Sequence, residues 1–500
     1  MKRQTFRLPT GGRIDRSSPL RYRFDGRQYE GFQGDTLASA LLANGIHLVG
    51  RSFKYHRPRG IVAAGSEEPN ALVQLGDGNR SEPNLRATSV ELHDGLVARS
   101  QNRWPTLDLD IGEVNNLLHR LIPAGFYYKT FMWPASWWMR YEHLIRHAAG
   151  LGIAPDGRDP DRYDKTHIHC DVLVIGGGPT GLAAALASGR TGARVLVVDE
   201  QRELGGSLLS ELDVEVNGTR GDSWTRSTVA ELEAMAEVKL LVRTTAVGYH
   251  DHNYLTLIER VTDHLGSAPE HLPRQRLWKV RAQQVVLAAG AFERPLVFAD
   301  NDRPGIMLAS AMRCYANRFA VAPGRQVAVF TNNDDAYRTA LDLQRAGIRI
   351  AAIIDLRAGP EGPLPAMARE AGITTYTDHT VVATYGARRL KSIEIMALTS
   401  DAKGVVGDPR RIECDALAMS GGWTPNVHLF SQSAGRLAWS ERVGSFVPDL
   451  SVQNERSAGA CKTAFSVTDC IKEGLKAGIE AARKAGHKGR GGLNCCVTDV

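Results

Sequence analysis

The stretch CDVLVIGGGPTGLAAALASGRTGARVLVVDE, residues 170–200, contains in order every part of a βαβ unit that binds a dinucleotide. The apolar run 171–175 is typical of a parallel strand that is buried on both faces. Gly176, Gly178 and Gly181 follow it in the G-x-G-x-x-G pattern, which permits a tight turn, backbone approach to a pyrophosphate and close packing of helix on strand. A small-residue helix over 182–188 would then point its N-terminal N–H groups at the phosphates.

The second strand of this unit, 194–198, ends at Asp199, which lies 18 residues after Gly181. A carboxylate at this position can accept hydrogen bonds from a ribose hydroxyl, and Glu200 is the competing choice. Arg202 lies near enough in the sequence to bind the 2′-phosphate of NADP, so that cofactor stays an alternative. Asp199 favours FAD or NAD over NADP.

In QRELGGSLL (201–209), Gly205 and Gly206 are expected where the chain must return past the cofactor. Two later stretches resemble strands of two-dinucleotide-domain flavoproteins of the glutathione-reductase type. QQVVLAAGAFERP (283–295) resembles the strand that rejoins the first dinucleotide fold, and ALAMSGGWTPN (416–426) resembles the later cofactor-contact strand. The predicted cofactor-binding residues are Gly176, Gly178, Pro179, Thr180, Gly181, Asp199, Glu200, Gln201, Arg202, Gly206, Ser207, Ala289, Gly290 and Gly422.

A second βαβ pattern occupies PGRQVAVFTNNDDAYRTALDLQRAGIRIAAIIDLR, residues 323–357. It predicts a strand over 326–330, a helix over 336–346 and a strand over 348–354 that ends at Asp355. Its turn reads Thr331, Asn332, Asn333, Asp334, Asp335, with no glycine. These side chains would crowd a pyrophosphate, and two carboxylates would already complement the helix dipole. We therefore expect a fold that is kept for its architecture.

The N-terminal residues predict a small α+β unit with a helix in DTLASALLANGI (35–46), where Asp35 is the expected N-cap and Gly45 the expected end. The unit resembles a plant-type ferredoxin β-grasp domain. Because residues 1–169 contain no cysteine and Ser52 is a poor substitute for one, we expect this domain to lack an Fe–S cluster. The following loop, RSFKYHRPRG (51–60), is predicted to dock a partner or to contact phosphate through Arg57 and Arg59.

Bulk composition bounds the function. A formal net charge of +6 on 500 residues does not imply nucleic acid, although the first 60 residues hold twelve Lys or Arg against four Asp or Glu. We expect no signal peptide and no membrane span, and the seven scattered cysteines favour a cytoplasmic, reduced chain. No spacing predicts a metal site, a redox C-x-x-C or a catalytic acid–base pair, so catalytic residues stay unassigned. The adjacent Cys495 and Cys496 are interpreted as bystanders.

The fold class predicted is α/β with an α+β N-terminal module: a ferredoxin-like β-grasp domain without a cluster, then two Rossmann-like dinucleotide-binding domains. The aromatic-rich linker is expected to pack in a core or between domains, and less often to form a partner interface. The expected boundaries are 1–100 for the β-grasp domain, 101–169 for the linker, 170–322 with 400–485 for the FAD/NAD domain, 323–399 for the degenerate second domain and 486–500 for a tail.

Four motifs in this order resemble the alpha subunit of heterotetrameric sarcosine oxidase and related amine oxidases and dehydrogenases: RSFKYHRPRG, AGFYYKTFMWP (124–134), VLVIGGGPTGLAAALAS (172–188) and AAGAFERPLVFADNDRPGIM (288–307). The resemblance implies a secondary amine as substrate, NAD or FAD in the alpha subunit, FAD in a beta subunit, FMN between them, and small gamma and delta subunits. Long members continue into a folate-binding domain, whereas this sequence stops at Val500 and is either a short member or part of a longer one. A stand-alone NAD(P)H-dependent flavin reductase and a non-catalytic scaffold with a structural dinucleotide are the alternatives.

Overall fold

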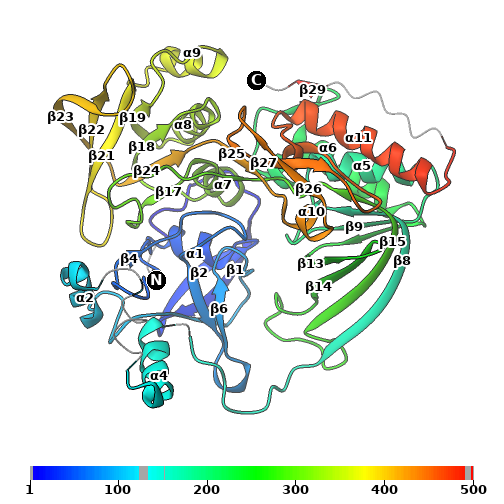
Figure 1. Ribbon diagram of the computed structural model, residues 1–500, viewed down its shortest axis with the longest axis horizontal. Helices are drawn as coiled ribbons and strands as arrows, with labels where there is room; N and C mark the ends of the chain where they lie inside the picture. The colour runs from blue at the N-terminus through cyan, green and yellow to red at the C-terminus, as the bar shows by residue number, and fades with distance from the viewer. Residues whose placement is uncertain (1–3, 123–124, 126–132, 151, 490–496, 499–500) are drawn as a thin grey trace. The chain divides into compact units, whose positions relative to one another are not determined.

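The structure is a computed structural model that describes residues 4–122, 125, 133–150, 152–489 and 497–498. The chain forms two compact units, each built from two separate stretches. Unit 1 comprises Met1–Pro160 and Pro295–Gly421, and unit 2 comprises Asp161–Arg294 and Gly422–Val500. Figure 1 shows the elements of both.

Unit 2 is built on a sheet of order β12-β9-β8-β15-β14-β13, in which β28 also pairs with β15. Strands β12, β9, β8, β15 and β28 run parallel, whereas β14 and β13 are antiparallel. The strands are β8 (Tyr163–Ile175), β9 (Val195–Val198), β12 (Val238–Leu241), β13 (Thr244–His250), β14 (Tyr254–Arg260), β15 (Gln275–Leu287) and β28 (Glu455–Ser457).

The buried half of β8 feeds two cores because its side chains alternate between the two faces of the sheet. Val172 and Val174 pack with the helices α5 (Pro179–Gly189), α6 (Gly221–Glu233) and α11 (Val467–Lys484), which Figure 1 shows together on one face. Leu173 and Ile175 pack in a second core with β13–β15. The smaller elements are η5 (Gly206–Leu209), β10 (Glu215–Val216), β11 (Thr219–Arg220), β16 (Ala291–Glu293), β25 (Trp423–Pro425), α10 (His428–Gln432), β26 (Arg436–Ser440), β27 (Ser445–Leu450), η6 (Gly459–Lys462) and β29 (Val497–Thr498).

The N-terminal part of unit 1 is a five-stranded sheet of order β2-β1-β7-β5-β6 with one buried helix. Its elements are β1 (Asp15–Phe24), β2 (Arg27–Gln33), α1 (Leu37–Ala43), β3 (Gly50–Arg51), β4 (Pro58–Arg59), β5 (Leu72–Leu75), η1 (Gly78–Arg80), β6 (Glu82–Arg86) and β7 (Leu96–Ser100).

The N-cap of α1 is Thr36, which forms a capping box with Ser39, and not Asp35 as expected. The Asp35 carboxylate is instead fully buried against the Arg7 guanidinium at 2.6 Å. A charge taken out of water needs such a partner. The carboxylate still contacts the first turn of the helix, because it accepts a hydrogen bond from the Ser39 hydroxyl at 2.7 Å.

The second half of unit 1 holds the other βαβ fold, a sheet of order β17-β24-β18-β19-β20. The predicted strand, helix and strand are observed within two residues as β18 (Gln326–Thr331), α8 (Asp335–Arg345) and β19 (Arg349–Asp355). The other elements are β17 (Ile306–Leu308), α7 (Ala309–Phe319), α9 (Pro363–Glu370), β20 (Thr375–Thr377), β21 (His379–Tyr385), β22 (Ser392–Leu398), β23 (Val405–Glu413) and β24 (Ala416–Ser420). Both halves of unit 1 share one hydrophobic core.

The units divide the chain differently from the expected domains. Residues 295–322 and 400–421 lie in unit 1, because β17 and β18 both pair with β24 in its sheet. Unit 2 also begins earlier than residue 170, since β8 starts at Tyr163.

The aromatic-rich segment belongs to unit 1 and exposes many of its large side chains. Its elements are η2 (Ile111–Glu113), α2 (Val114–Leu117), η3 (His119–Leu121), η4 (Ala135–Trp137) and α4 (Trp138–Ala149). Residues 124 and 126–132 of the AGFYYKTFMWP motif and the pair Cys495 and Cys496 lie outside the described residues. Among the helices that the structure describes, none is long and apolar enough to cross a membrane.

Candidate functional site

The candidate site lies at the carboxyl edge of the unit 2 sheet, where the turns after four parallel strands meet. Three backbone hydrogen bonds tie these turns together: Gly176 N–H to Val198 O at 2.9 Å, Ala288 N–H to Ile175 O at 2.8 Å, and Ala458 N–H to Leu287 O at 3.0 Å. Ligands of open α/β sheets bind at this edge. The site is therefore built by β8, β9, β15 and β28.

Two of the glycines after β8 are required by close backbone contacts. A Cβ on Gly181 would lie 1.8 Å from Gly176 O, and one on Gly176, whose φ is +99°, would lie 2.3 Å from Ala288 O. Any larger residue would force the strand, the turn and the helix apart. These two positions therefore hold the turn itself.

Gly178 is different because its missing side chain faces open space. A Cβ there would find only Gly206 Cα, at 3.8 Å. Gly178 is also the N-cap of α5, where no side chain accepts the first N–H groups of the helix. A cradle that a side chain would fill, beside uncapped helix N–H groups, fits the pyrophosphate of a dinucleotide.

Asp199 is held at the end of β9 by the glycine turn. Its carboxylate accepts N–H hydrogen bonds from Gly177 at 2.6 Å and from Gln201 at 2.8 Å. These bonds fix the direction of a side chain that a ribose could contact. Arg260 donates to the backbone carbonyl of Glu200 at 2.7 Å, which secures the next residue.

The remaining predicted residues lie at different distances from the carboxyl edge of the sheet along their elements. Thr180 is buried, and its side chain packs where a Cβ on Gly459 would come within 2.1 Å of its hydroxyl. Ala289 and Gly290 follow β15 at the carboxyl edge, whereas Gly422 lies at the far end of the β16–β25 ladder, next to the pair Glu293 and Trp423. Pro179 begins α5, Arg202 forms an ion pair with its neighbour Glu203, and Gly206 and Ser207 begin η5.

The sequence analysis missed the turn after β28, which contains Gly459 at the start of η6. Gly474 and Gly478 of α11 were missed too; a Cβ on either would lie 2.2 Å from a backbone oxygen of α5. The stretch ERSAGA (455–460) carried the available signal, a strand followed by a small-residue turn, as at 288–290.

The second βαβ turn is filled by its own side chains. Arg357 lies between Asp334 and Asp355, at 2.8 Å from each carboxylate. Tyr337 donates its hydroxyl to the buried Asp355 at 2.8 Å. Burial, followed by this hydrogen bond, raises the pKa of Tyr337 above its ordinary value. A salt-bridged cluster thus lies after β18 and β19, at the positions that correspond to the glycine turn and Asp199 of the first βαβ unit.

The two arginines predicted to dock a partner or contact phosphate form ion pairs inside unit 1. Arg57 and Arg59 each lie 2.6 Å from a carboxylate oxygen of Asp302, and Arg57 also contacts Asp300. The hydrogen bond to Asp302 is the largest cause that raises the pKa of Arg57 above its ordinary value. These carboxylates offset the positive charge that the loop shows in the sequence.

Comparisons with known proteins find relatives of this region and of the whole chain. A family model described as FAD dependent oxidoreductase matches residues 171–264. The sarcosine oxidase alpha subunit of Rhizobium meliloti (strain 1021) is 48% identical over 96% of this chain and 48% of its own length. That of Corynebacterium sp. (strain P-1) is 40% identical over 97% of this chain and 46% of its own length. This chain is similar to sarcosine oxidase alpha subunits.

The resemblance to sarcosine oxidase alpha subunits that the motifs predicted is confirmed, and the chain spans about half the length of these curated relatives. A solved structure, L-proline dehydrogenase from P. horikoshii, has a TM-score of 0.65 at 19% identity and covers 97% of this chain and 77% of its own. At that identity the match shows the fold alone.

A family model described as 2Fe-2S iron-sulfur cluster binding domain matches residues 17–103. We expected a ferredoxin-like fold that lacks an Fe–S cluster and a set of cofactors that includes none. The match contradicts the absence of the cluster, because the matched family is a cluster-binding one. The matched residues contain no cysteine, whereas the cluster is ordinarily held by cysteine thiolates. The residues present therefore do not fit that ligand set.

Proposed function

We propose that this chain acts as the alpha subunit, or the corresponding part of one, in a multi-subunit flavoenzyme that oxidises sarcosine or a related secondary amine. The observation that carries the proposal is 48% identity to a sarcosine oxidase alpha subunit over 96% of the chain. The FAD-dependent oxidoreductase family over residues 171–264 supports the same reaction class, oxidation at a CH–NH group.

The site at the carboxyl edge of unit 2 holds the dinucleotide, FAD or NAD, in this proposal. Gly178 leaves room for the pyrophosphate, α5 directs N–H groups at it, and Asp199 meets the ribose. Gly206, where a Cβ would lie 2.8 Å from Gly178 Cα, lets the chain pass close beside this turn. A bound flavin or nicotinamide supplies a carrier for the electron pair that leaves the amine. The chain's own residues bind and orient that carrier.

Partner subunits complete the chemistry in this proposal. The sequence contains no recognisable acid–base pair for amine oxidation, and the resemblance to the oxidase implies a beta subunit that carries FAD and an FMN between the subunits. The released imine would then be hydrolysed by water.

The test uses the complex purified from cells that co-express the chain with its partner subunits. Mass spectrometry of the released cofactors, together with the identities of the subunits, identifies the dinucleotide and the partners. We expect sarcosine-dependent turnover by the complex, and bound dinucleotide without turnover in the chain alone. Rapid sarcosine oxidation by the chain alone would contradict the proposal.

A further inference from the structure

Loop 51–57 and segment 104–122 of unit 1, which are joined by hydrogen bonds, expose an unusual number of large apolar side chains. We call these two segments together the platform. The exposed fractions of its large apolar residues range from 47% to 79% in the set Phe53, Trp104, Leu109, Ile111, Val114, Leu117, Leu118 and Leu121. The sequence analysis expected this aromatic-rich region chiefly in a core or between domains, and the structure exposes these residues.

The size of the platform is that of a protein interface. Eight such side chains represent on the order of 1,000 Å² of surface, about what one partner buries in a standard interface (roughly 800 Å²). The largest apolar patch on an ordinary monomer is only about 300–600 Å². An apolar surface of this size is expected to be covered in the working protein.

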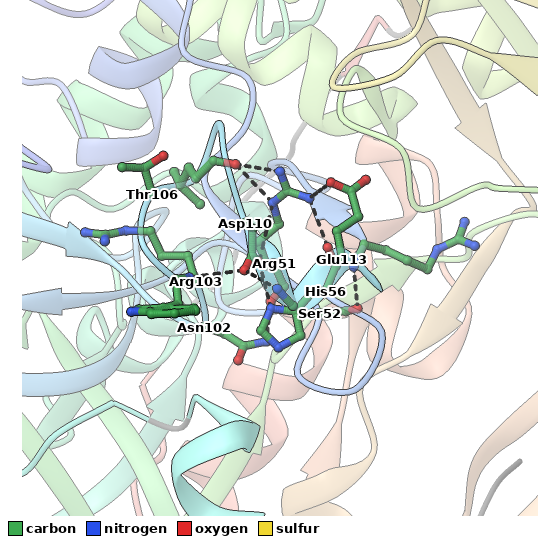
Figure 2. A network of polar contacts seen from close by, with 12 residues as sticks. Arg51, Ser52, His56, Asn102, Arg103, Thr106, Asp110 and Glu113 are labelled. Carbon is green, nitrogen blue, oxygen red and sulfur yellow. Dashed lines mark hydrogen bonds and ion pairs between the residues drawn. The ribbon is translucent and has the colours of Figure 1, made fainter. Parts of the chain in front are cut away.

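A buried polar network, shown in Figure 2, holds the two segments of the platform in their conformation. The Arg51 guanidinium, 1% exposed, donates to Leu107 O at 3.1 and 2.6 Å and to the Glu113 carboxylate at 3.0 Å. Asp110, whose side chain is fully buried, accepts N–H hydrogen bonds from Trp104 at 3.1 Å and Gly112 at 3.0 Å. Loop and segment are thereby locked together although they are about 50 residues apart in the chain.

Further contacts complete this ordering. The His56 ring lies 2.6 Å from Asp110 and packs so closely on Gly112 that a Cβ there would be 2.3 Å from the ring. Tyr55 donates its hydroxyl to Ile122 O at 2.9 Å. A surface that is already ordered loses little conformational entropy when it binds. The platform thus has the properties of a preformed docking surface.

The charges of the platform indicate what kind of partner it fits. It contains four Lys or Arg and three Asp or Glu, a formal excess of one positive charge. Asp108 is paired with Arg388, Glu113 with Arg51, and Arg57 with Asp302. A nearly neutral apolar surface gains little from a polyanion or an anionic membrane. It fits a protein surface that is itself apolar.

We propose that the platform is the surface that binds the flavin-bearing partner subunit, through an apolar face of that subunit. The inference rests on the proposed function, which supplies the partner. It is supported by the names of similar proteins, which describe them as subunits of oxidases that act on sarcosine and on opines.

The test introduces two charges at the most exposed positions of the platform, Leu117→Glu with Leu121→Glu. These side chains are 79% and 78% exposed, so the fold should tolerate the change. The matched control is Val405→Glu with Val406→Glu on β23 of the same unit, where the exposed fractions are 43% and 55%. Each variant is co-expressed with the flavin-bearing subunit, then purified through a tag on this chain.

We expect the platform variant to retain at least tenfold less flavin-bearing subunit per chain, with unchanged dinucleotide content and melting temperature, and the control to match the wild type. Hydrogen exchange of residues 104–122 in the wild type should slow when the partner binds. Full retention of the partner by the platform variant, or no slowing of exchange, would overturn the proposal.

Two further results would also overturn it, by naming another occupant. A wild-type chain that is dimeric alone, and that the platform variant makes monomeric while the partner is retained, assigns the surface to a second copy. In the other result, the wild type and the control float with phosphatidylcholine–phosphatidylserine vesicles while the platform variant does not. If the variant still retains the partner, that result assigns the platform to a membrane. A complex that depends on the platform yet does not oxidise sarcosine would refute the proposed substrate and support the docking surface.

Discussion

The chain contains the same βαβ fold twice, and the two copies differ most in the turn after the first strand. In unit 2 the turn after β8 has a gap at Gly178, and no side chain caps the helix that follows. In unit 1 the turn after β18 binds itself: Thr331 Oγ1 accepts the Asn333 N–H at 3.0 Å, and Asn333 Oδ1 accepts the Asp335 N–H at 3.2 Å.

The difference indicates what the proposed binding would require of such a fold, namely a turn that leaves N–H donors and space for a ligand. Asp199 and Asp355 both lie at the end of the second strand of their βαβ fold, β9 and β19 respectively. Each accepts the backbone N–H two residues further on. Asp199 also accepts the Gly177 N–H of the glycine turn, whereas the fully buried Asp355 lies 2.8 Å from the Arg357 guanidinium. Strand and helix positions are shared, so the two folds differ in the side chains of their turns, on which the proposed difference in binding depends.

The largest expected effect comes from Gly181→Val, which tests whether the glycine turn is required for the fold. The added Cβ would lie 1.8 Å from Gly176 O, a contact that only a backbone shift can relieve. We expect a loss of more than about 4 kcal/mol in the free energy of unfolding, measured by urea denaturation. The control is Gly359→Val in unit 1, where no atom lies within 4 Å of the added Cβ. Wild-type stability of the Gly181 variant would contradict this geometry.

Gly178→Val separates the cradle from the fold. Its Cβ meets only Gly206 Cα at 3.8 Å, so the protein should fold while the side chain fills the space for the pyrophosphate. We expect at least tenfold less bound dinucleotide, and a melting temperature within about 3 °C of the cofactor-free wild type. The variant complex should also lose turnover. Full turnover in a complex that lacks the dinucleotide would favour the scaffold alternative, in which that cofactor is structural.

Both βαβ units could be predicted from the sequence because their signals are local. The apolar strands, the glycines before α5 and the acid after β9 all lie within residues 170–200, and β18, α8 and β19 were placed within two residues. The self-filled turn of the second copy was expected from the side chains of 331–335. The family model at 17–103 corrected a conclusion that rested only on the missing cysteines.

What the sequence did not predict depends on contacts between distant residues. The lengths of β8 and β15 follow from their pairing with each other over residues 163–175 and 275–287, and from the pairing of β15 with β14. Gly459 joins the site only because β28 pairs with β15, about 170 residues earlier in the chain. The partners of Arg57, which are Asp300 and Asp302, are equally remote.

Arg357→Met tests the self-filled turn and should have a smaller effect. Asp355 has no exposed surface, and the guanidinium of Arg357 donates to both of its oxygens, at 3.0 and 2.8 Å. Removing that partner leaves a buried charge, and because Arg357 is 34% exposed we expect a cost of about 2–3 kcal/mol in urea denaturation. Dinucleotide content should not change. Arg388→Met, which breaks an exposed pair, is the control and should cost less than about 0.5 kcal/mol. Altered dinucleotide content in the Arg357 variant would contradict the assignment of this turn to architecture.

The smallest expected effect concerns the amino end of the glycine-containing fold, where Asp171 joins β8 to Arg194 and to His487 after α11. Hydrogen bonding from Arg194 is the largest cause that lowers the pKa of Asp171, from 3.8 to about 2. Because the folded-state pKa lies below the unfolded value, this stabilisation is fully present above about pH 4 and is lost as the pH falls towards 2. Asp171→Asn should therefore cost about 1–2 kcal/mol at pH 7, a figure reduced for the half-exposed Arg194, and progressively less below pH 4. Urea denaturation at several pH values measures this, with Asp408→Asn, at an exposed position of β23, as a control that should show no measurable change. A cost that stays constant from pH 7 to pH 2 would show that Asp171 acts through packing and not through its charge.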